Sequence, residues 1–274
     1  MPTAPRRPRP WSSGRFGASA LGSFVVTYLS VIVLLPVVAL VGHAFGNGWS
    51  GFFSSLTTTE ARDALALTLA TSAVATVVNV LFGTALAWVL ARDSFPGLGL
   101  VNAVIDLPFA LPTVVAGVTL MTLYGPHSPL HLSIANTPVG IIVALLFVTL
   151  PFTVRSVQPL VATLQRDDEL AAQTLGASRW RAWRTVVLPS LLPGIATGAG
   201  LAFARAVGEF GSVVFISGNR PFHTEVASSY VFMLSQDQAF NSAAAVSVFL
   251  LVVALVVLAV AHATSRRLAT KRHG

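Results

Sequence analysis

The sequence contains no cysteine and a single lysine, and it has few charged residues of either sign. The absence of cysteine excludes thiolate nucleophiles, cysteine-ligated zinc, iron–sulfur clusters and disulfides. The one lysine, Lys271, lies in the C-terminal tail. No Gly-Lys-Ser or Gly-Lys-Thr run is present, so the chain does not itself contain a Walker-type nucleotide site. The six histidines show no metal-ligand spacing of the H-E-x-x-H kind. We therefore expect no cofactor and no metal site.

The low charge is matched by long hydrophobic runs. Charged residues make up 10% of the chain, against about 25% in soluble domains, and 54% of the residues are hydrophobic. Runs of about 20 apolar residues are long enough to cross a bilayer as helices, and these are too uniformly apolar for β-barrel strands. Six such runs cover residues 20–43, 64–91, 101–124, 137–155, 193–217 and 241–263. The sequence predicts an all-α integral membrane protein with a six-helix domain at 20–263, a disordered basic segment at 1–19 and a basic tail at 264–274.

Positive charges alternate with the predicted spans. Arginines lie before the first span and after the second, fourth and last, whereas the loops after the first, third and fifth contain only Arg62 and Arg220. Because cytoplasmic loops carry the excess of Lys and Arg, we expect a multi-pass protein with both termini in the cytoplasm and a retained first span. The pI of about 11.2 then reflects topology and attraction to anionic lipids, and requires no nucleic-acid partner.

Two predicted spans contain residues that are unusual inside a membrane. The third is interrupted by Asp106, Pro108 and Pro112, which predicts a kinked helix. The fifth carries Arg205 and Glu209, four residues apart and so on one face of a helix. Because ionisable residues are costly at this depth, this pair is the best candidate for a site within the spans. A self-neutralising structural ion pair and a pair lining a pathway across the membrane are equally compatible with the pattern.

A charged segment, residues 167–189, separates the fourth and fifth spans and reads DDELAAQTLGASRWRAWRTVVLP. Its pattern predicts helix, turn, helix, with Gly176 ending the first helix and Ser178 capping the second. In the second helix the two tryptophans and Val187 share one face, and Pro189 is expected to end it. Spacing alone leaves two interpretations open: an interfacial amphipathic helix, or a cytoplasmic protrusion that another protein binds.

The same segment resembles the EAA loop of permease subunits from bacterial ATP-driven importers that use a periplasmic binding protein. The resemblance is carried by Ala171-Ala172, Gly176 and Leu188-Pro189. It departs from the pattern at Leu170, where the loop has Glu; Glu169 lies one residue earlier. The runs LPTVVAGVTLMTLYGP, TPVGIIVALLFVTLPFTVRSVQPL and FARAVGEFGSVVFISGN resemble the sulfate and molybdate branch of that family, and within it the sulfate/thiosulfate permeases.

The resemblance implies the type I importer permease fold and a non-catalytic subunit of a complex in the bacterial plasma membrane. Its implied partners are a second permease subunit of the CysW type, two ATP-binding subunits that hydrolyse the ATP, and a periplasmic or lipid-anchored sulfate-binding protein. The segment 167–189 would be the coupling helix seated on an ATPase. The residues implied in that contact are Glu169, Ala171, Ala172, Gly176, Ala177, Ser178, Trp180, Arg181 and Trp183.

Other classes of function remain open. Molybdate or another oxyanion is an alternative substrate for the same architecture. An ion-coupled secondary transporter is a weaker alternative, because the sequence has no evident inverted repeat and only Asp106, Arg205 and Glu209 are clearly within spans. A membrane enzyme would require catalytic groups clustered at one depth, and the sequence shows no such cluster.

Overall fold

The computed structural model describes residues 15–270, and every regular element in that range is a helix. The prediction of an all-α membrane protein is therefore confirmed. Helix α1 begins at Arg15, so residues 15–19 of the segment predicted to be disordered are helical, while residues 1–14 and 271–274 lie outside the described part. The elements are α1 (Arg15–Leu29), the π-helical turn η1 (Ser30–Leu34), α2 (Leu35–Ala44), α3 (Gly48–Thr57), α4 (Thr59–Arg92), α5 (Leu98–Ala110), α6 (Thr113–Tyr124), α7 (Pro138–Thr163), α8 (Arg166–Thr174), α9 (Arg179–Ala182), the π-helical turn η2 (Trp183–Val187), α10 (Leu188–Val207), α11 (Gly211–Ser217), α12 (Ala227–Gln236) and α13 (Phe240–Thr270).

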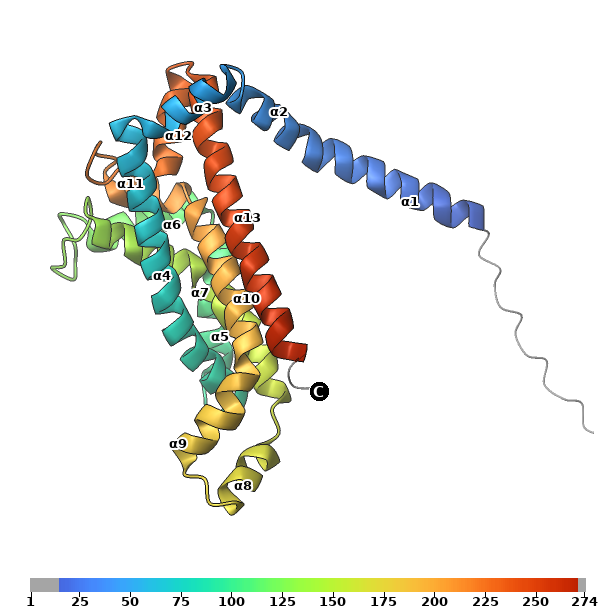
Figure 1. Cartoon of the computed structure of the whole chain (residues 1–274). Helices are drawn as coiled ribbons and strands as arrows, with labels where there is room; N and C mark the ends of the chain where they lie inside the picture. Colours follow the sequence, from blue (N-terminus) through green and yellow to red (C-terminus); the bar gives the residue numbers. More distant parts are fainter. Residues whose placement is uncertain (1–14, 271–274) are drawn as a thin grey trace, which may run out of the picture.

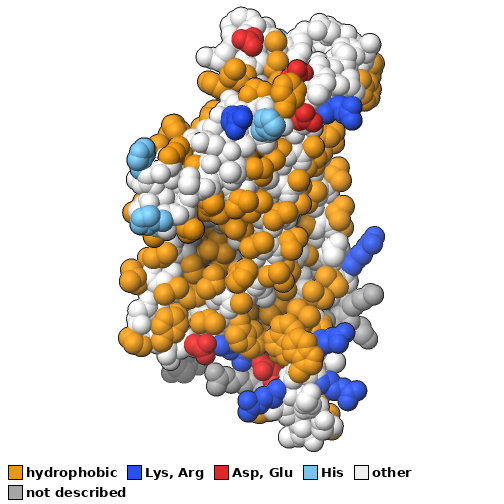
Figure 2. Space-filling view, turned by 90° about the vertical axis from the view of Figure 1, so that its left-hand side faces the viewer, with side chains coloured by type: hydrophobic (Ala, Val, Ile, Leu, Met, Phe, Trp, Pro, Cys, Tyr) orange, Lys and Arg blue, Asp and Glu red, His pale blue; other side chains and the backbone are white. Residues whose placement is uncertain are grey.

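Five helical segments in the described residues are long and apolar enough to cross a membrane. They are Gly22–Ala44, Thr59–Arg92, Pro138–Thr163, Arg179–Val207 and Phe240–Leu268, and the bent pair α5 and α6 makes a sixth crossing when counted as one span. Figure 1 places α8 and α9 at one end of the bundle and α3 and α12 at the other. In Figure 2, most charged side chains lie at the two ends of the bundle, and hydrophobic side chains cover most of the surface between them.

The core of the bundle is formed by α4, α7, α10 and α13. Small residues allow close approach: a Cβ on Gly198 of α10 would lie 3.0 Å from the Cα of Thr153 in α7, and one on Gly200 would lie 2.5 Å from the Cβ of Ala261 in α13. By contrast, the first span leaves the bundle near α3 and extends away from it, and none of its most apolar window is buried (Figure 1).

Two predicted spans break, one where the sequence predicted a kinked helix and one where it predicted a continuous helix. The third span does not kink but bends by 114° between α5 and α6. Leu111 is extended there because a residue that precedes a proline is driven from the helical region, and Pro112 is then the N-cap residue of α6. The fifth predicted span, 193–217, is likewise divided, since α10 ends at Val207 and α11 starts at Gly211.

Two other predicted boundaries were wrong, and both helices run further than expected. Helix α7 continues past residue 155 to Thr163. Pro189 does not end the helix that follows Ser178, because Arg179–Val207 is one continuous span through η2 and α10. The hydrogen bonds change register at η2, where the Leu188 N–H donates to the Trp183 carbonyl five residues back. A proline, which needs no N–H partner, fits at the start of the helix that resumes there.

Candidate functional site

The turn between α8 and α9 has the geometry that its sequence predicted. Gly176 has φ +88°, and no atom lies within 4 Å of a Cβ built on it, so glycine is needed for its backbone conformation and not for space. The N–H of Ala177 donates to the carbonyl of Ala172, which closes the end of α8. Ser178 then caps α9 by accepting a hydrogen bond from the Arg181 N–H. The first helix is thereby folded back toward the second.

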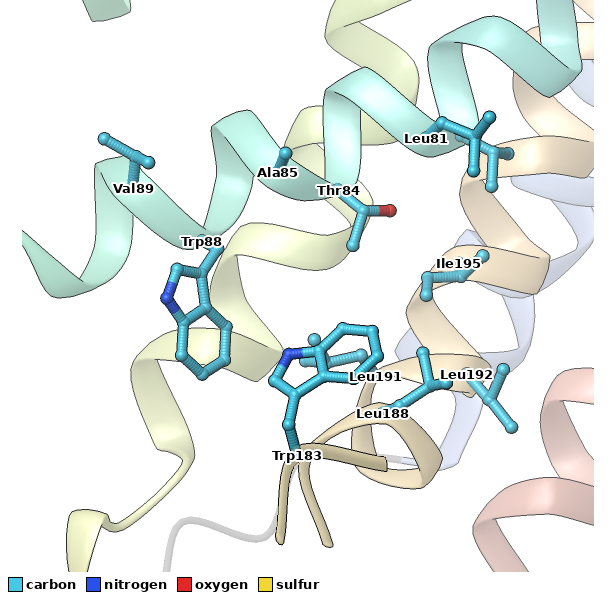
Figure 3. A pocket seen from close by; sticks show the side chains of 11 residues that line it. Leu81, Thr84, Ala85, Trp88, Val89, Trp183, Leu188, Leu191, Leu192 and Ile195 are labelled. Carbon is cyan, nitrogen blue, oxygen red and sulfur yellow. The ribbon is translucent and has the colours of Figure 1, made fainter. Parts of the chain in front are cut away.

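The two tryptophans of this segment stack but have different surroundings. Their ring centroids lie 5.2 Å apart with 10° between the planes. Trp183 packs against the buried cluster that contains Val187 and Leu191, and with Trp88 it lines an apolar cavity of about 590 Å³ between α4 and α10 (Figure 3). Trp180 remains 66% exposed. Trp183 therefore anchors the segment to its own bundle, and Trp180 is the one available to another molecule.

Glu169 is held by this chain's own helix α4. Its carboxylate accepts a hydrogen bond from Arg92 at 2.7 Å, and both side chains are largely covered. The Arg92 guanidinium also lies over the Trp88 ring, 4.9 Å from its centroid. Sequence reasoning missed Arg92 as the partner of Glu169. The two residues are 77 positions apart in the sequence and come together only in the folded chain. The neighbouring Leu170 is exposed instead, as is Leu175 in the turn.

Arg205 and Glu209 form an ion pair, but not within one helix as predicted. Arg205 is in the last turn of α10, whereas Glu209 follows the C-cap Gly208 in the break. The Glu209 carboxylate, 3% exposed, also accepts hydrogen bonds from the Ser212 N–H at 2.8 Å and hydroxyl at 2.9 Å. It thus caps the start of α11 while it neutralises Arg205. The Arg205 side chain keeps a third of its surface exposed.

The breaks of the two interrupted spans lie against each other beside this ion pair. A Cβ on Gly211 would lie 2.2 Å from the Thr113 hydroxyl, and one on Gly117 would lie 2.8 Å from the Ser212 carbonyl oxygen. Irregular backbone at membrane depth is tolerated where protein or a water-filled cavity satisfies it. The described residues contain no group of three or more His, Asp or Glu side chains that could hold a metal ion.

Asp106 does not join this ion pair. It instead binds Arg155 of α7, whose guanidinium lies 2.6 Å from the Asp106 carboxylate. The sequence analysis ended the fourth span at residue 155, so Arg155 was not recognised as a residue inside the helix, which continues to Thr163. The signal that could have placed Arg155 inside the helix is that polar residues in the run VRSVQP alternate with apolar ones that continue the helical pattern.

Helices that break within the membrane beside a buried ion pair are typical of multi-pass permeases, in which irregular backbone lines the route of a solute. The chain belongs to the family described as binding-protein-dependent transport system inner membrane component, whose model matches residues 79–270. It is therefore a transport permease component.

The chain is similar to sulfate permeases over most of its own length and of theirs. The chain is 39% identical over 238 residues to the sulfate transport system permease protein CysT of Escherichia coli (strain K12), covering 84% of this chain and 86% of that protein. It is 40% identical over 243 residues to a probable sulfate transport system permease protein cysT of Nephroselmis olivacea, covering 86% of each.

Solved structures share the fold at low identity. A chain of a bacterial ABC transporter involved in the import of the acidic polysaccharide alginate matches with a TM-score of 0.76 and 20% identity, covering 92% of this chain and 96% of that one. A chain of an amino acid ABC transporter matches with a TM-score of 0.54 and 18% identity, covering 74% and 92%. The fold is therefore that of a type I ABC importer permease.

Proposed function

We propose that the chain is the permease subunit that translocates sulfate, and thiosulfate with it, in a binding-protein-dependent ABC importer of the bacterial inner membrane. The observation that carries the proposal is the identity of about 40% with sulfate permeases across most of both chains. A guanidinium held inside the spans, at Arg205, supports an anionic substrate. The work is translocation without covalent chemistry, driven by ATP hydrolysis on separate subunits.

The partners follow from the same proposal. The chain pairs with a second permease subunit of the CysW type, two ATP-binding subunits and an external sulfate-binding protein, with both of its termini in the cytoplasm. The protruding turn between α8 and α9 seats on an ATP-binding subunit, with exposed Trp180 as an apolar contact and Arg181 meeting acidic groups. Glu169, Ala171, Ala172, Gly176, Ala177, Ser178 and Trp183 shape and hold that contact from within the segment.

The test is uptake of labelled sulfate in a bacterial strain from which this chain has been deleted. Restoring the chain should restore uptake, with unlabelled thiosulfate competing more strongly than molybdate. Stronger competition by molybdate would assign the chain to molybdate. Uptake that is unchanged by the deletion, or that collapses with the proton gradient while ATP is maintained, would contradict the proposal.

A further inference from the structure

A second arginine within a span, Arg155, lies in α7 within a network of polar side chains. Its Nε donates to Asp106 Oδ1 at 2.8 Å and its NH2 to Asp106 Oδ2 at 2.6 Å. NH1 donates to Asn102 Oδ1 at 2.9 Å and to Gln158 Oε1, and NH2 also donates to the Asn102 carbonyl at 3.2 Å. All five N–H donors of the guanidinium are therefore used.

The acceptors around Arg155 fall into two kinds. Asn102 and Gln158 are neutral amides, which fix the position of the guanidinium without cancelling its charge. Asp106 alone cancels the charge, through a two-pronged contact with Nε and NH2. Two oxygens of a tetrahedral oxyanion fit the same pair of donors, since carboxylate and phosphate-like groups both bind arginine in this forked way. Removing the Asp106 carboxylate would leave the guanidinium in place, with its Nε and NH2 donors available to another anion.

The network is partly exposed. The Arg155 side chain is 30% exposed and that of Asp106 is 47% exposed, so the exchangeable partner is the more exposed of the two. A charged pair facing hydrocarbon would be costly, so charged residues inside spans face water or protein. The exposed side of the network therefore faces the interior of the assembled importer.

Arg155 lies at a different depth from Arg205. The contact between Gly198 and Thr153 aligns α10 with α7. Arg205 is seven residues beyond Gly198 toward one end, and Arg155 is two residues beyond Thr153 toward the other. At about 1.5 Å per residue, the two arginines are separated by roughly 13 Å along the bundle. Arg205 is the outer one, and Arg155 is nearer the end that carries α8 and α9.

We propose that Arg155 is a second, inner oxyanion-binding residue of the translocation path, and that the transported anion displaces Asp106 from it. Asp106 neutralises Arg155 when the path is empty. After the anion has bound, the Asp106 carboxylate competes with it for the guanidinium and displaces it, and the anion leaves toward the cytoplasmic side. The inference rests on the proposed function, because it takes the transported ligand to be an oxyanion.

The test uses the purified complex of permease and ATP-binding subunits, without the binding protein, and equilibrium binding of labelled sulfate. Asp106→Asn should tighten binding several-fold, because the competing charge is gone while the amide keeps hydrogen bonds. The double variant Asp106→Asn with Arg155→Gln should bind sulfate at least about tenfold more weakly than Asp106→Asn alone, because the charge-assisted hydrogen bonds from Arg155 are lost. The double variant should still assemble, because neutral side chains of similar size bridge α5 and α7.

Labelled-sulfate uptake in cells separates the possible failures. The double variant should lose uptake at normal complex levels. Wild-type uptake in the double variant, or unchanged sulfate affinity in Asp106→Asn, would overturn the role of Arg155 while leaving the proposed function intact, because the network would then only join two helices. Absence of sulfate uptake with the wild-type chain would overturn both. If the double variant does not assemble, the affinity of Asp106→Asn alone decides.

Discussion

The Glu209 carboxylate binds Arg205, the Ser212 N–H and the Ser212 hydroxyl at the point where a span breaks. A buried carboxylate that loses its cation retains its desolvation cost, which makes removal of one partner far more damaging than removal of both. The structural and pathway roles of this pair therefore give different results in single and double variants.

Arg205→Ala is expected to lower the melting temperature of the purified complex, because it leaves Glu209 charged and buried. Adding Glu209→Gln should restore much of the stability, since the amide oxygen still accepts from Ser212. Uptake of labelled sulfate measured on the same variants then separates the roles. Restored stability without uptake supports a pathway role for Arg205, restored uptake supports a structural pair, and normal uptake in Arg205→Ala alone contradicts both.

Glu225, in the loop before α12, gives a prediction about pH. Burial raises the pKa of its carboxyl above the ordinary value, and the Glu60 carboxylate adds to the rise. The folded state therefore binds the proton more tightly than the unfolded state, and this group makes stability fall as the pH rises from about 4.3 through the raised value.

Glu225→Gln should remove that loss. Melting temperatures of the complex between about pH 5 and about pH 8 should fall less steeply in Glu225→Gln than in the wild type. Glu60→Gln is the matched control with an intermediate slope, because it removes only the second cause. Equal slopes in all three proteins would contradict the assignment.

At the scale of elements, the turn between α8 and α9 depends on one backbone conformation. Gly176→Val places a β-branched residue at φ +88°, which costs about 1–3 kcal/mol and reorients the turn. Gly99→Ala is the matched control, since its Cβ also meets no atom within 4 Å but no left-handed backbone is required.

We expect Gly176→Val to insert in the membrane normally but to lose co-purification with the ATP-binding subunit, or ATPase stimulation by the loaded binding protein. Gly99→Ala should retain both. Intact association and stimulation in Gly176→Val and in Trp180→Ala would indicate that the segment rests on the lipid surface.

The packing of α6 on α11 is a second property of elements. A Cβ at Gly117 would lie 2.8 Å from the Ser212 carbonyl oxygen, which is backbone and cannot rotate away. Gly117→Ala should therefore destabilise the complex by about 1–3 kcal/mol in chemical denaturation and reduce uptake. Gly42→Ala, whose Cβ meets nothing within 4 Å, should do neither. Equal stability of the two variants would show that the helices separate at no cost.

How far the sequence predicts these elements depends on how local their causes are. Hydrophobic runs, the left-handed Gly176 and the Ser178 cap are set by neighbouring residues, and all were predicted. The break at Leu111 and Pro112 was predicted only as a kink, because its angle is set by packing against α11. The partners Arg92 for Glu169 and Arg155 for Asp106 were missed, since they lie 77 and 49 residues away in sequence.

At the scale of the whole molecule, the direction of each span is testable. Reporter fusions after Gly46, His127 and Gly218 should report an external location, and fusions after Asp93, Ser178 and Lys271 an internal one, because arginines gather on the second set of loops. Paired activity assays, one active only outside and one only inside, measure this. A reversed result at two of the six sites would refute the orientation.

The π-helical turn η2 has a further consequence for the span Arg179–Val207. Such a turn accommodates one extra residue, and in a regular helix one residue corresponds to about 100° of rotation and about 1.5 Å of rise. The angular phase between Trp180 and Arg205 is therefore set by η2. Deleting one residue from it would make the hydrogen bonding regular and would rotate Trp180 by about 100° relative to Arg205, while Arg205 and Glu209, which both follow η2, would stay paired.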